Sequence, residues 1–597
     1  MSIVPLQKIT VAGLVREKDW LLERLQDYGG VHLIPLRPPQ RELEEIPTGR
    51  ADEAYKALRY LGDFPEKRRQ VRDPAGFDLD ATIQRVMANR TRLREVTDRR
   101  AFLTRRIRDL APWGDFAFPP EEELSGQKLW FYVVPHHEMA RVRASDLIWE
   151  VVHRDNRNTY VAVISPHEPP PGAMPVPRTH TGARARSDLQ RELEWIEIEL
   201  EDIVAERYEL TKWIRLIAAN LARAEDRAAR ERVAAETLDE EDFFALQGWI
   251  RADHLKVAEA FAAEHQLALV AEDPLHADRP PTLLENPPAL RGGEDLVRFY
   301  QTPAYTEWDP SPVVFCSFVL FFAMIMADAG YGLILAGIVA LYWKRMGESA
   351  LGLRMRTLAA WLAGATIVYG VLSGGYFGLP PPEGSLLAAF DVVDLDDIDA
   401  MMQLSIAIGV GHIVLASAIR ASRARRRSGR LQPLGWATAA IGALLMYLGD
   451  DGALFNFGIV LLAGGLGVVA VFASDRAITS AKDLALRGLD ACRSLTSVTK
   501  IFGDVLSYIR LFALGLAGSS LALTINDLAD QVAHALPGPG LLVAILVVLL
   551  GHLINLALCV MSGVVHGLRL NVIEFFNWGL AEEGHPFRPF AKKESAP

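Results

Sequence analysis

Apolar residues are arranged differently in the two halves of this chain of 597 residues. From Val313 onward, long apolar stretches recur between short polar loops, and a bilayer core takes roughly 20 apolar residues of helix. Before that point, apolar residues recur every three or four positions among charged ones, which is typical of amphipathic helices. The pattern therefore predicts a charged soluble half, residues 1–310, and a membrane half, residues 311–597.

Eight membrane spans account for the apolar stretches. Val313–Tyr342 would measure about 45 Å as one helix at about 1.5 Å per residue, and it contains Asp328 beside small residues. We therefore expect two short spans there, broken near Asp328–Gly332. The other six are expected at Leu358–Leu379, Met401–Ile419, Pro433–Leu448, Phe455–Phe472, Leu489–His534 and Leu541–Trp578.

The distribution of basic residues predicts the orientation of these spans. With the N-terminus in the cytosol, the cytoplasmic connections and the C-terminal tail hold 16 of the 20 Lys and Arg residues after Pro310. The opposite loops, Pro380–Ala400, Gly449–Leu454 and Ala535–Gly540, hold none. Since Lys and Arg concentrate in cytoplasmic loops, and Met1–Leu36 lacks the apolar stretch of a secretory signal, we expect both termini in the cytosol.

Two amphipathic segments of the soluble half predict an antiparallel coiled-coil stalk. One helix is expected near 81–111, and a longer one near 186–235 follows a 4, 3, 4, 3 spacing that predicts a left-handed coiled coil. Its apolar positions are Leu189, Leu193, Ile196, Leu200, Ile203, Leu210, Ile214, Ile217 and Leu221.

Short strand patterns predict two small α/β lobes at the ends of the stalk, one near 1–80 plus 230–290 and one near 120–170. The expected strands are Ile9–Leu14, Gly30–Leu36, Leu246–Ile250, Leu267–Glu272, Lys128–Val134 and Thr159–Ser165. The expected fold is therefore mainly α: a cytoplasmic antiparallel coiled-coil stalk with two α/β lobes, then an eight-helix transmembrane domain with two long tilted helices. Such a stalk is typical of a rigid connector to which other proteins bind. The alternative interpretation of this half is an autonomous ligand-binding domain.

Charge and motif content exclude several classes of function. The whole net charge of −11 lies in the first 310 residues, and an acidic surface argues against nucleic-acid binding. The three cysteines, Cys316, Cys492 and Cys559, lack the spacing of a disulfide scaffold or zinc ribbon. Without a Gly-Lys dipeptide there is no Walker A loop, and H-E-x-x-H is also absent. We expect no cofactor and no metal, so energy for any uphill transport must come from elsewhere.

Two arginines stand out within the last two spans. Arg510 precedes Pro537 by 27 residues, and Arg569 follows Gly540 by 29 residues, so an antiparallel hairpin places both at one level. Each span is too long for an upright crossing, since Leu541–Trp578 would measure about 57 Å, and we expect steep tilt or inner ends outside the membrane. An arginine in hydrocarbon costs about 2.5–3.5 kcal/mol and usually marks a pathway.

Polar side chains form one face of the eighth span at a spacing of 3, 4, 3, 4, 3. They are His552, Asn555, Cys559, Ser562, His566 and Arg569. The seventh span adds Asp504, Ser507, Tyr508 and Arg510. These residues predict a wet or proton-conducting path, while the structural alternative is an ion pair of Arg510 with Asp504 or Glu574. For His552 alone, structural packing is the favoured interpretation.

Two motifs carry a resemblance to a known family. Gly503-Asp-Val-Leu-Ser-Tyr-Ile-Arg510-Leu-Phe-Ala-Leu and His566-Gly-Leu-Arg569-Leu-Asn-Val-Ile-Glu574-Phe-Phe resemble the last two spans of the V/A-type rotary ATPase membrane stator, subunit a, called subunit I in prokaryotes. The resemblance extends over essentially the whole chain, including Met326-Ala-Asp-Ala-Gly-Tyr-Gly332.

The resemblance implies a static, non-catalytic half-channel protein beside a rotating ring of small membrane subunits that each carry a carboxylate. Arg510 matches the family's essential arginine and Arg569 its second arginine. The translocated ion would be H⁺ or Na⁺. Other expected members of the path are His566, Ser562, Glu574, Asp504 and Ser507, with His552, Asn555 and Tyr508 as further candidates.

The chain departs from the family pattern at several positions of the last predicted span. Asn571 replaces a Gln or His, Asn577-Trp578 replaces a Lys-aromatic pair, and Cys559 replaces a eukaryotic glutamate. The implied partners are the ring, peripheral-stalk subunits, central-stalk and ATPase head subunits, and the lipid bilayer.

Two other classes of membrane protein fit the sequence pattern less well than the stator. A secondary ion transporter with a regulatory cytosolic coiled coil would show an inverted repeat, whereas the long spans here occur only at the end. A membrane-anchored scaffold would leave the arginine pair unexplained. The short, insertion-poor chain suggests a prokaryotic plasma membrane.

Overall fold

The computed structural model describes residues 2–37, 48–73, 75–116, 126–180, 184–275, 278–382, 384–394, 397–424, 426–449, 451–476, 480–535 and 539–593, with the backbone alone at 48–51. Its internal contacts divide the chain into two compact units. The first unit comprises Met1–Val15, Gly30–Leu36 and Leu238–Phe590, and the second comprises Arg16–Gly29, Arg37–Thr237 and Ala591–Pro597.

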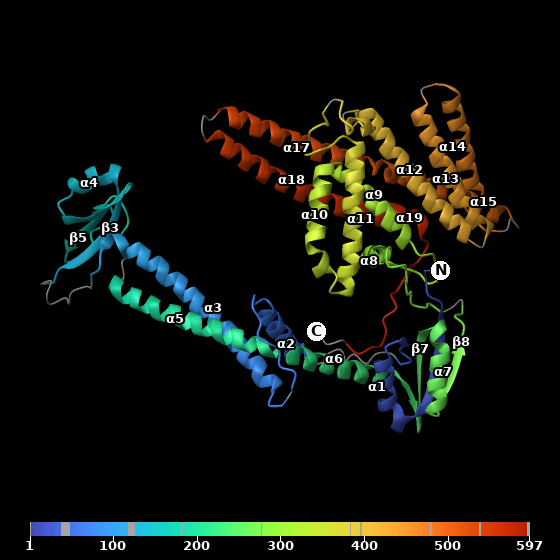
Figure 1. Cartoon of the computed structure of the whole chain (residues 1–597), viewed down its shortest axis with the longest axis horizontal. Coiled ribbons are helices and arrows are strands. Elements are labelled where there is room, and N and C mark those ends of the chain that lie inside the picture. The colour runs from blue at the N-terminus through green and yellow to red at the C-terminus, as the bar shows by residue number, and fades with distance from the viewer. Residues whose placement is uncertain are drawn as a thin grey trace. The chain divides into compact units, whose positions relative to one another are not determined.

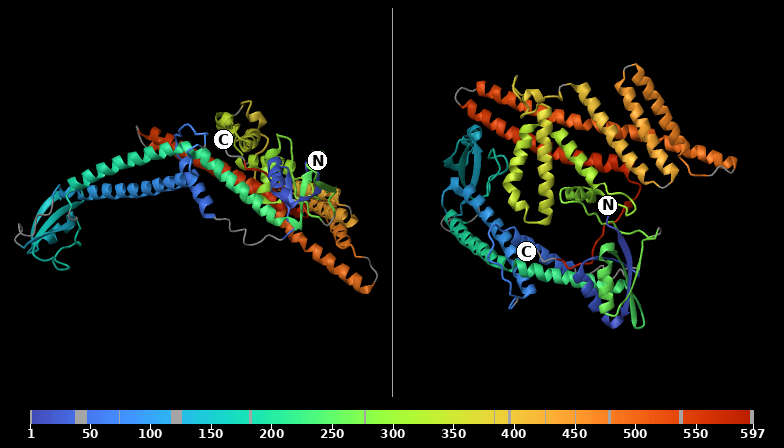
Figure 2. Two further views of the ribbon diagram at one scale, coloured as in Figure 1. Left: turned by 90° about the horizontal axis from the view of Figure 1, so that it is seen from below. Right: turned by 45° about the vertical axis from the view of Figure 1, so that its right-hand side comes forward.

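Two antiparallel helices, α3 (Leu79–Leu110) and α5 (Arg186–Leu210), form the stalk of the second unit and lie side by side in both views of Figure 2. Three ion pairs join them, Arg85–Glu206, Arg92–Glu199 and Arg99–Glu192. Successive pairs are seven residues apart in opposite directions along the two helices, as expected for antiparallel neighbours. The 3₁₀ turn η5 (Thr211–Trp213) then leads into α6 (Ile214–Glu236).

A further helix that the sequence analysis did not predict, α2 (Thr48–Gly62), lies within the range expected for an α/β lobe. It packs on the stalk through Leu61 against Ile83 and Ile217. The buried Asn89 joins three helices, because it accepts a hydrogen bond from the Tyr60 hydroxyl at 2.8 Å and donates to the Ile203 carbonyl at 3.1 Å. The helical stalk is therefore thicker here than the two-helix pattern predicts.

A three-stranded antiparallel sheet lies at one end of the stalk, in the order β3 (Lys128–Pro135), β5 (Asn158–Ser165), β4 (Ile148–Arg154). The helix α4 (Met139–Arg143) follows β3, and its Val142 is fully buried. The sequence predicted β3 and β5 but missed β4, an edge strand with no fully buried residue. The same unit contains α1 (Lys18–Tyr28), which packs against α6.

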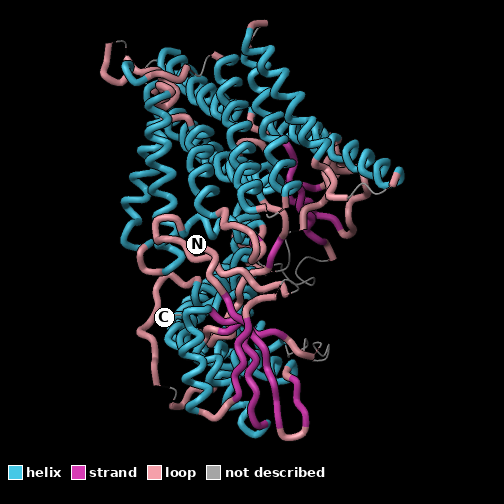
Figure 3. Tube along the Cα trace, turned by 90° about the vertical axis from the view of Figure 1, so that its right-hand side faces the viewer, coloured by secondary structure: helices cyan, strands magenta, loops and turns pink. Residues whose placement is uncertain are grey.

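The sheet of the first unit is antiparallel throughout, in the order β2 (Val31–Ile34), β7 (Phe243–Arg251), β1 (Leu6–Leu14), β8 (Ala268–Glu272) (Figure 3). The short β6 (Leu238–Glu240) pairs with β7, and α7 (Leu255–Glu264) connects β7 to β8. These elements match the strand-helix-strand pattern predicted for 246–272.

The end of the chain returns to the edge of this sheet. The Phe590 amide donates to the Val31 carbonyl at 2.8 Å, and the Arg588 amide donates to Nδ1 of His32 at 2.9 Å. β9 (Thr302–Pro303) pairs with β10 (Glu583–Gly584).

The other 3₁₀ turns of the described residues are η1 (Val15–Glu17), η3 (Ala111–Trp113), η4 (His136–Glu138), η6 (Ala252–His254) and η7 (Ala388–Phe390).

The rest of the first unit is helical (Figure 1). Its helices are α8 (Arg291–Tyr300), α9 (Ser311–Met326), α10 (Ala329–Met346), α11 (Ala350–Leu372), α12 (Ile398–Arg423), α13 (Arg427–Leu448), α14 (Ala453–Val471), α15 (Ala481–Leu495), α16 (Ser497–Leu506), α17 (Ile509–Ala535), α18 (Gly540–Arg569), the π-helix η8 (Leu570–Phe575) and α19 (Phe576–Gly579). Within the described ranges, six helical stretches are long and apolar enough to cross a membrane: α11, α12, α13, α14, the run α15–α17 and the run α18–α19.

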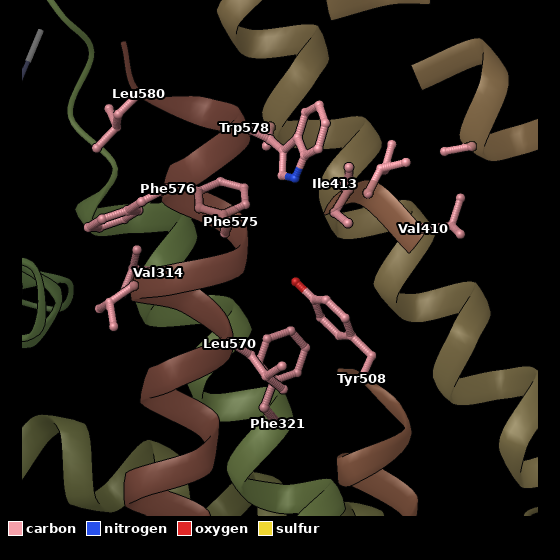
Figure 4. Close-up of a cluster of buried hydrophobic side chains, with 14 of the residues drawn as sticks. Val314, Phe321, Val410, Ile413, Tyr508, Leu570, Phe575, Phe576, Trp578 and Leu580 are labelled. Atoms are coloured by element: carbon pink, nitrogen blue, oxygen red, sulfur yellow. The ribbon is translucent and has the colours of Figure 1, made fainter. Parts of the chain in front are cut away.

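The break predicted near Asp328 lies between α9 and α10. Ala327 adopts a left-handed conformation with φ of 44°, and the Asp328 carboxylate caps α10 by accepting from the Tyr331 amide at 2.9 Å. Apolar side chains from α9, α12, η8 and α19 pack around Tyr508, as Figure 4 shows for Phe321 and Phe575. This core surrounds the start of α17.

Candidate functional site

The helices α17 and α18 are antiparallel and packed against each other (Figure 1). Arg510 is the second residue of α17 and Arg569 the last residue of α18, so both arginines lie at the same end of the pair. Their charges interact with each other, and both interact with the carboxylate of Glu574. The predicted turn residues Pro537 and Gly538 lie outside the described residues.

Glu574 is a buried carboxylate, only 2% exposed, within η8. Its Oε1 lies 4.0 Å from Nε of Arg569, whose side chain is 49% exposed. Its Oε2 has no hydrogen-bond partner among the described residues. Burying an ionised carboxylate is costly unless nearby charge compensates it, so the arginine pair supplies the compensation for Glu574.

Arg510 is half-buried, and its Nη1 is buried without a hydrogen-bond partner in the described part of the chain. No described carboxylate lies within the 4.0 Å that defines an ion pair to Arg510. Asp504 instead accepts a hydrogen bond from Nε1 of Trp578 at 2.7 Å. The structural alternative, an ion pair of Arg510 with Asp504 or Glu574, is therefore not formed among these residues.

His566 and Ser562 continue the polar face of α18 one and two turns before Arg569, and both are half-buried. The imidazole of His566 interacts electrostatically with both arginines, and its Nδ1 is buried without a described partner. The inner part of the predicted polar face thus borders the arginine pair directly.

The outer part of the same face is a packed hydrogen-bond cluster. The Tyr331 hydroxyl is 2.8 Å from Nδ1 of His552 and accepts from Nδ2 of Asn555 at 2.9 Å. Nε2 of His552 is 3.0 Å from Oδ1 of Asn526, and Nδ2 of Asn555 also donates to the Gly518 carbonyl at 2.9 Å. The polar face is therefore divided into an outer cluster that joins α10, α17 and α18 and an inner group around the arginines.

Two candidates near Arg510 have partners inside the helix core. The Ser507 hydroxyl donates to the Gly503 carbonyl of its own helix at 3.0 Å. The Tyr508 hydroxyl, fully buried, is 2.8 Å from Nδ1 of His412 on α12. His412 was not among the residues predicted for the site. It is the only ionisable side chain between Met401 and Ile419, and an ionisable residue in a membrane span is itself a signal of function.

Among the described residues, no group of three or more His, Cys, Asp and Glu side chains is placed to hold a metal ion. The chemistry of the site therefore comes from two cations, one buried carboxylate and imidazole groups. Such a set can bind an anionic side chain and pass protons, since Arg510 and His566 are half-buried and the Arg569 side chain is half exposed, while Glu574 is buried beside them.

Comparison with known proteins gives the family. The chain is 30% identical over 482 residues to the V-type ATP synthase subunit I of Chlamydia pneumoniae, covering 68% of each chain. It is 26% identical over 444 residues to the A-type ATP synthase subunit I of Methanocaldococcus jannaschii, covering 69% of this chain and 64% of that one. It is 24% identical over 616 residues to the V-type ATP synthase subunit I of Borreliella burgdorferi, covering 99% of both.

No family model matches the chain. A crystal structure of the cytoplasmic N-terminal domain of subunit I, homolog of subunit a of V-ATPase, is matched at 18% identity and a TM-score of 0.21, covering 45% of this chain and 100% of that one. The first of the sequence relatives is similar enough, over enough of its length, to settle the family. This chain belongs to the subunit I family of V/A-type ATP synthases.

Proposed function

We propose that this chain is the static membrane subunit of a V/A-type rotary ATPase, forms its two aqueous half-channels, and uses Arg510 to couple translocation of H⁺ or Na⁺ to rotation of a ring of small membrane subunits. The family supports a non-catalytic membrane subunit of such a complex.

The unpaired state of Arg510 carries the proposal. A half-buried guanidinium with a buried, unpartnered Nη1 and no described carboxylate within 4.0 Å is an incomplete ion pair. Because leaving a charge buried and unpaired is costly, its natural partner is an acid from another chain. A carboxylate on each ring subunit would complete the pair as it passes.

The coupling follows from the cost of moving charge through lipid. A protonated carboxylate can rotate through hydrocarbon, whereas an ionised one cannot because its desolvation is too costly. An opposite charge within about 4–6 Å favours the ionised form, so Arg510 makes the ring carboxylate release its ion on one side and reload on the other. At 100 mV each charge supplies about 2.3 kcal/mol, so several ions must pass for each ATP.

The inner polar groups would line the path on either side of Arg510. Arg569, His566, Ser562 and Glu574 are the proposed members on α18 and η8. The proximity of Arg569 to Glu574, the interaction of His566 with both arginines and the place of Ser562 on the same face of α18 support this assignment. Asp504 and Ser507 are weaker members, since each has a hydrogen-bond partner within the chain. The further candidates His552, Asn555 and Tyr508 are also engaged in hydrogen bonds, which favours structural roles for them.

The membrane arrangement we propose has eight spans, with α9 and α10 as the two short ones added to the six long stretches. Both termini would be cytoplasmic, in a prokaryotic plasma membrane. Residues 1–310 would form the cytoplasmic domain that anchors peripheral stalks, and central-stalk and ATPase head subunits of the same complex would be further partners. The stalk of α3 and α5, stapled by three ion pairs, is suited to resist the torque of a rotor.

Replacing Arg510 by lysine tests the proposal. Arg510→Lys should abolish ATP-driven ion pumping in vesicles despite the retained charge, because an ammonium cannot reproduce the planar fork of donors. Arg493→Lys, an exposed arginine on α15, is the matched control and should leave pumping unchanged. Normal pumping by Arg510→Lys would contradict the proposal. A pull-down in mild detergent should also recover small ring subunits and head components, which a secondary transporter would not bring.

A further inference from the structure

His412 contacts both segments that carry the charged groups of the site. It lies in the middle of α12 and is only 7% exposed. Its Nδ1 is 2.8 Å from the Tyr508 hydroxyl, two residues before Arg510. Its ring stacks on Phe575, the neighbour of Glu574, with centroids 4.3 Å apart and planes at 11°.

Both contacted segments are irregular in their backbone. Tyr508 lies in the two-residue turn that separates α16 from α17, and Phe575 is the last residue of the π-helix η8. Helix interruptions and π-helices are places where the direction of a helix is set by local contacts. A side chain that contacts both irregular segments therefore influences the placement of Arg510 and Glu574 more than a side chain that packs on a regular helix does.

The surroundings of His412 leave it a single orientation. Phe321 packs against its ring edge-on at 5.2 Å between centroids. Gly409, three residues earlier on the same face, allows the Tyr508 ring to approach, because a Cβ there would lie 2.7 Å from the ring. Flipping the imidazole would break its hydrogen bond to Tyr508. One ring orientation therefore satisfies both the hydrogen bond to Tyr508 and the stacking on Phe575.

The polar character of His412 is not explained by packing alone. Its Nε2 is buried and has no hydrogen-bond partner in the described structure. A phenylalanine would fill the same place without an unsatisfied nitrogen, and leaving such a group unpaired costs stability. Among the described residues, the hydrogen bond between Nδ1 and the Tyr508 hydroxyl is the interaction that offsets the cost of burying this imidazole.

We propose that His412 is a positioning residue that fixes Tyr508 and Phe575 in one arrangement and thereby sets the placement of Arg510 relative to Glu574. The inference rests on the proposed function, because it assumes that this placement governs ion translocation. The imidazole acts through its neighbours and does not itself need to exchange a proton.

A double substitution separates positioning from proton transfer. The variants are measured in assembled complexes in vesicles. His412→Phe should keep the ring stacking on Phe575 but leave the Tyr508 hydroxyl without its hydrogen-bond partner. The number of ions pumped per ATP should then fall by about tenfold, as for one lost buried hydrogen bond. Adding Tyr508→Phe removes the stranded hydroxyl, and replacing both partners by apolar groups of similar shape is nearly neutral. The double variant should therefore assemble and recover pumping to within about twofold of the original.

Controls make each outcome decisive. Ser417→Ala, which removes another buried polar atom of α12 that lacks a partner, should leave pumping unchanged. Normal pumping by His412→Phe, a double variant as impaired as the single one, or failure of the double variant to assemble would overturn the inference. If Arg510→Lys abolishes pumping while His412→Phe does not, only this inference fails; if Arg510→Lys pumps normally, the proposed function fails.

Discussion

Truncating Arg569 is expected to leave a buried carboxylate without its nearest cation. Glu574 is almost fully buried, and Nε of Arg569 lies 4.0 Å from its Oε1. Two unit charges at about 4 Å interact by about 4 kcal/mol at an effective dielectric constant of about 20. Because the Arg569 side chain is half exposed, solvent screening lowers this value, and we expect Arg569→Ala to cost about 1–3 kcal/mol of stability.

A second substitution should restore what the first removes. Glu574→Gln keeps the shape of the side chain but removes its charge, so Arg569→Ala with Glu574→Gln should be more stable than Arg569→Ala alone. A change of 1 kcal/mol shifts the midpoint of thermal unfolding by about 2–4 °C in a domain of some 150–250 residues. Tryptophan fluorescence of the full chain in detergent, followed during heating, measures these midpoints.

The same variants distinguish a counter-charge from a member of the ion path. If Glu574→Gln alone still pumps, low pumping in the double variant despite a recovered unfolding midpoint places Arg569 on the path. If pumping recovers together with the midpoint, Arg569 serves only to neutralise Glu574. An unchanged midpoint in Arg569→Ala would refute the reasoning, because the burial of Glu574 would then not depend on this ion pair.

Three further changes test the stalk and the end of the chain. Leu200→Pro should break α5, since proline inside a helix costs about 3 kcal/mol or more, and the ratio of ions pumped to ATP hydrolysed should fall; an unchanged ratio would count against the rigid connector. Asn89→Ala should destabilise the stalk by about 2–4 kcal/mol, because three hydrogen bonds lose a buried partner; denaturant unfolding followed by circular dichroism measures this loss. Burial, and then the neighbouring His585, lowers the pKa of His32, whose Nδ1 accepts the Arg588 amide. The unfolded state therefore takes up the proton first as pH falls below about 6.5. Stability is full above that pH and declines below it, so the protection factor of the Arg588 amide against hydrogen exchange should fall there, but not in His32→Gln.

The elements predicted from the sequence are those for which a repeated physical constraint leaves a pattern. A bilayer demands long apolar helices, which marked α11 to α14 and the last two runs. A two-helix seam demands apolar residues along one face, which marked α3 as amphipathic and α5 by its heptad spacing. The edge strand β4 buries too little to leave such a pattern, and α2 packs on a third face of the stalk that the heptad does not describe.

The relative position of Arg510 and Arg569 could be predicted because both residues lie on one helical hairpin. Counting residues on both sides of the turn placed Arg510 and Arg569 at one end of the pair, because antiparallel helices of equal rise keep equal distances from their connection. The partners that come from elsewhere in the chain could not be counted in this way. His412 on α12 and the pairing of Asp504 with Trp578 depend on how distant helices pack, which the linear pattern does not contain.

The π-helix η8 has a consequence for the geometry of everything that follows it. A π-helical turn holds one residue more than an α-helical turn, and each residue of an α-helix advances the chain by about 100° around the axis. Deleting one residue from Leu570–Phe575 would let the segment close into an ordinary α-helix. Since the wider turn only absorbs the extra residue, Trp578 would keep about the same direction and its bond to Asp504. The same deletion inside the regular helix α18 would instead rotate every later residue by about 100°. The π-helix thus accommodates one more residue while the indole of the last turn stays aligned with its acceptor.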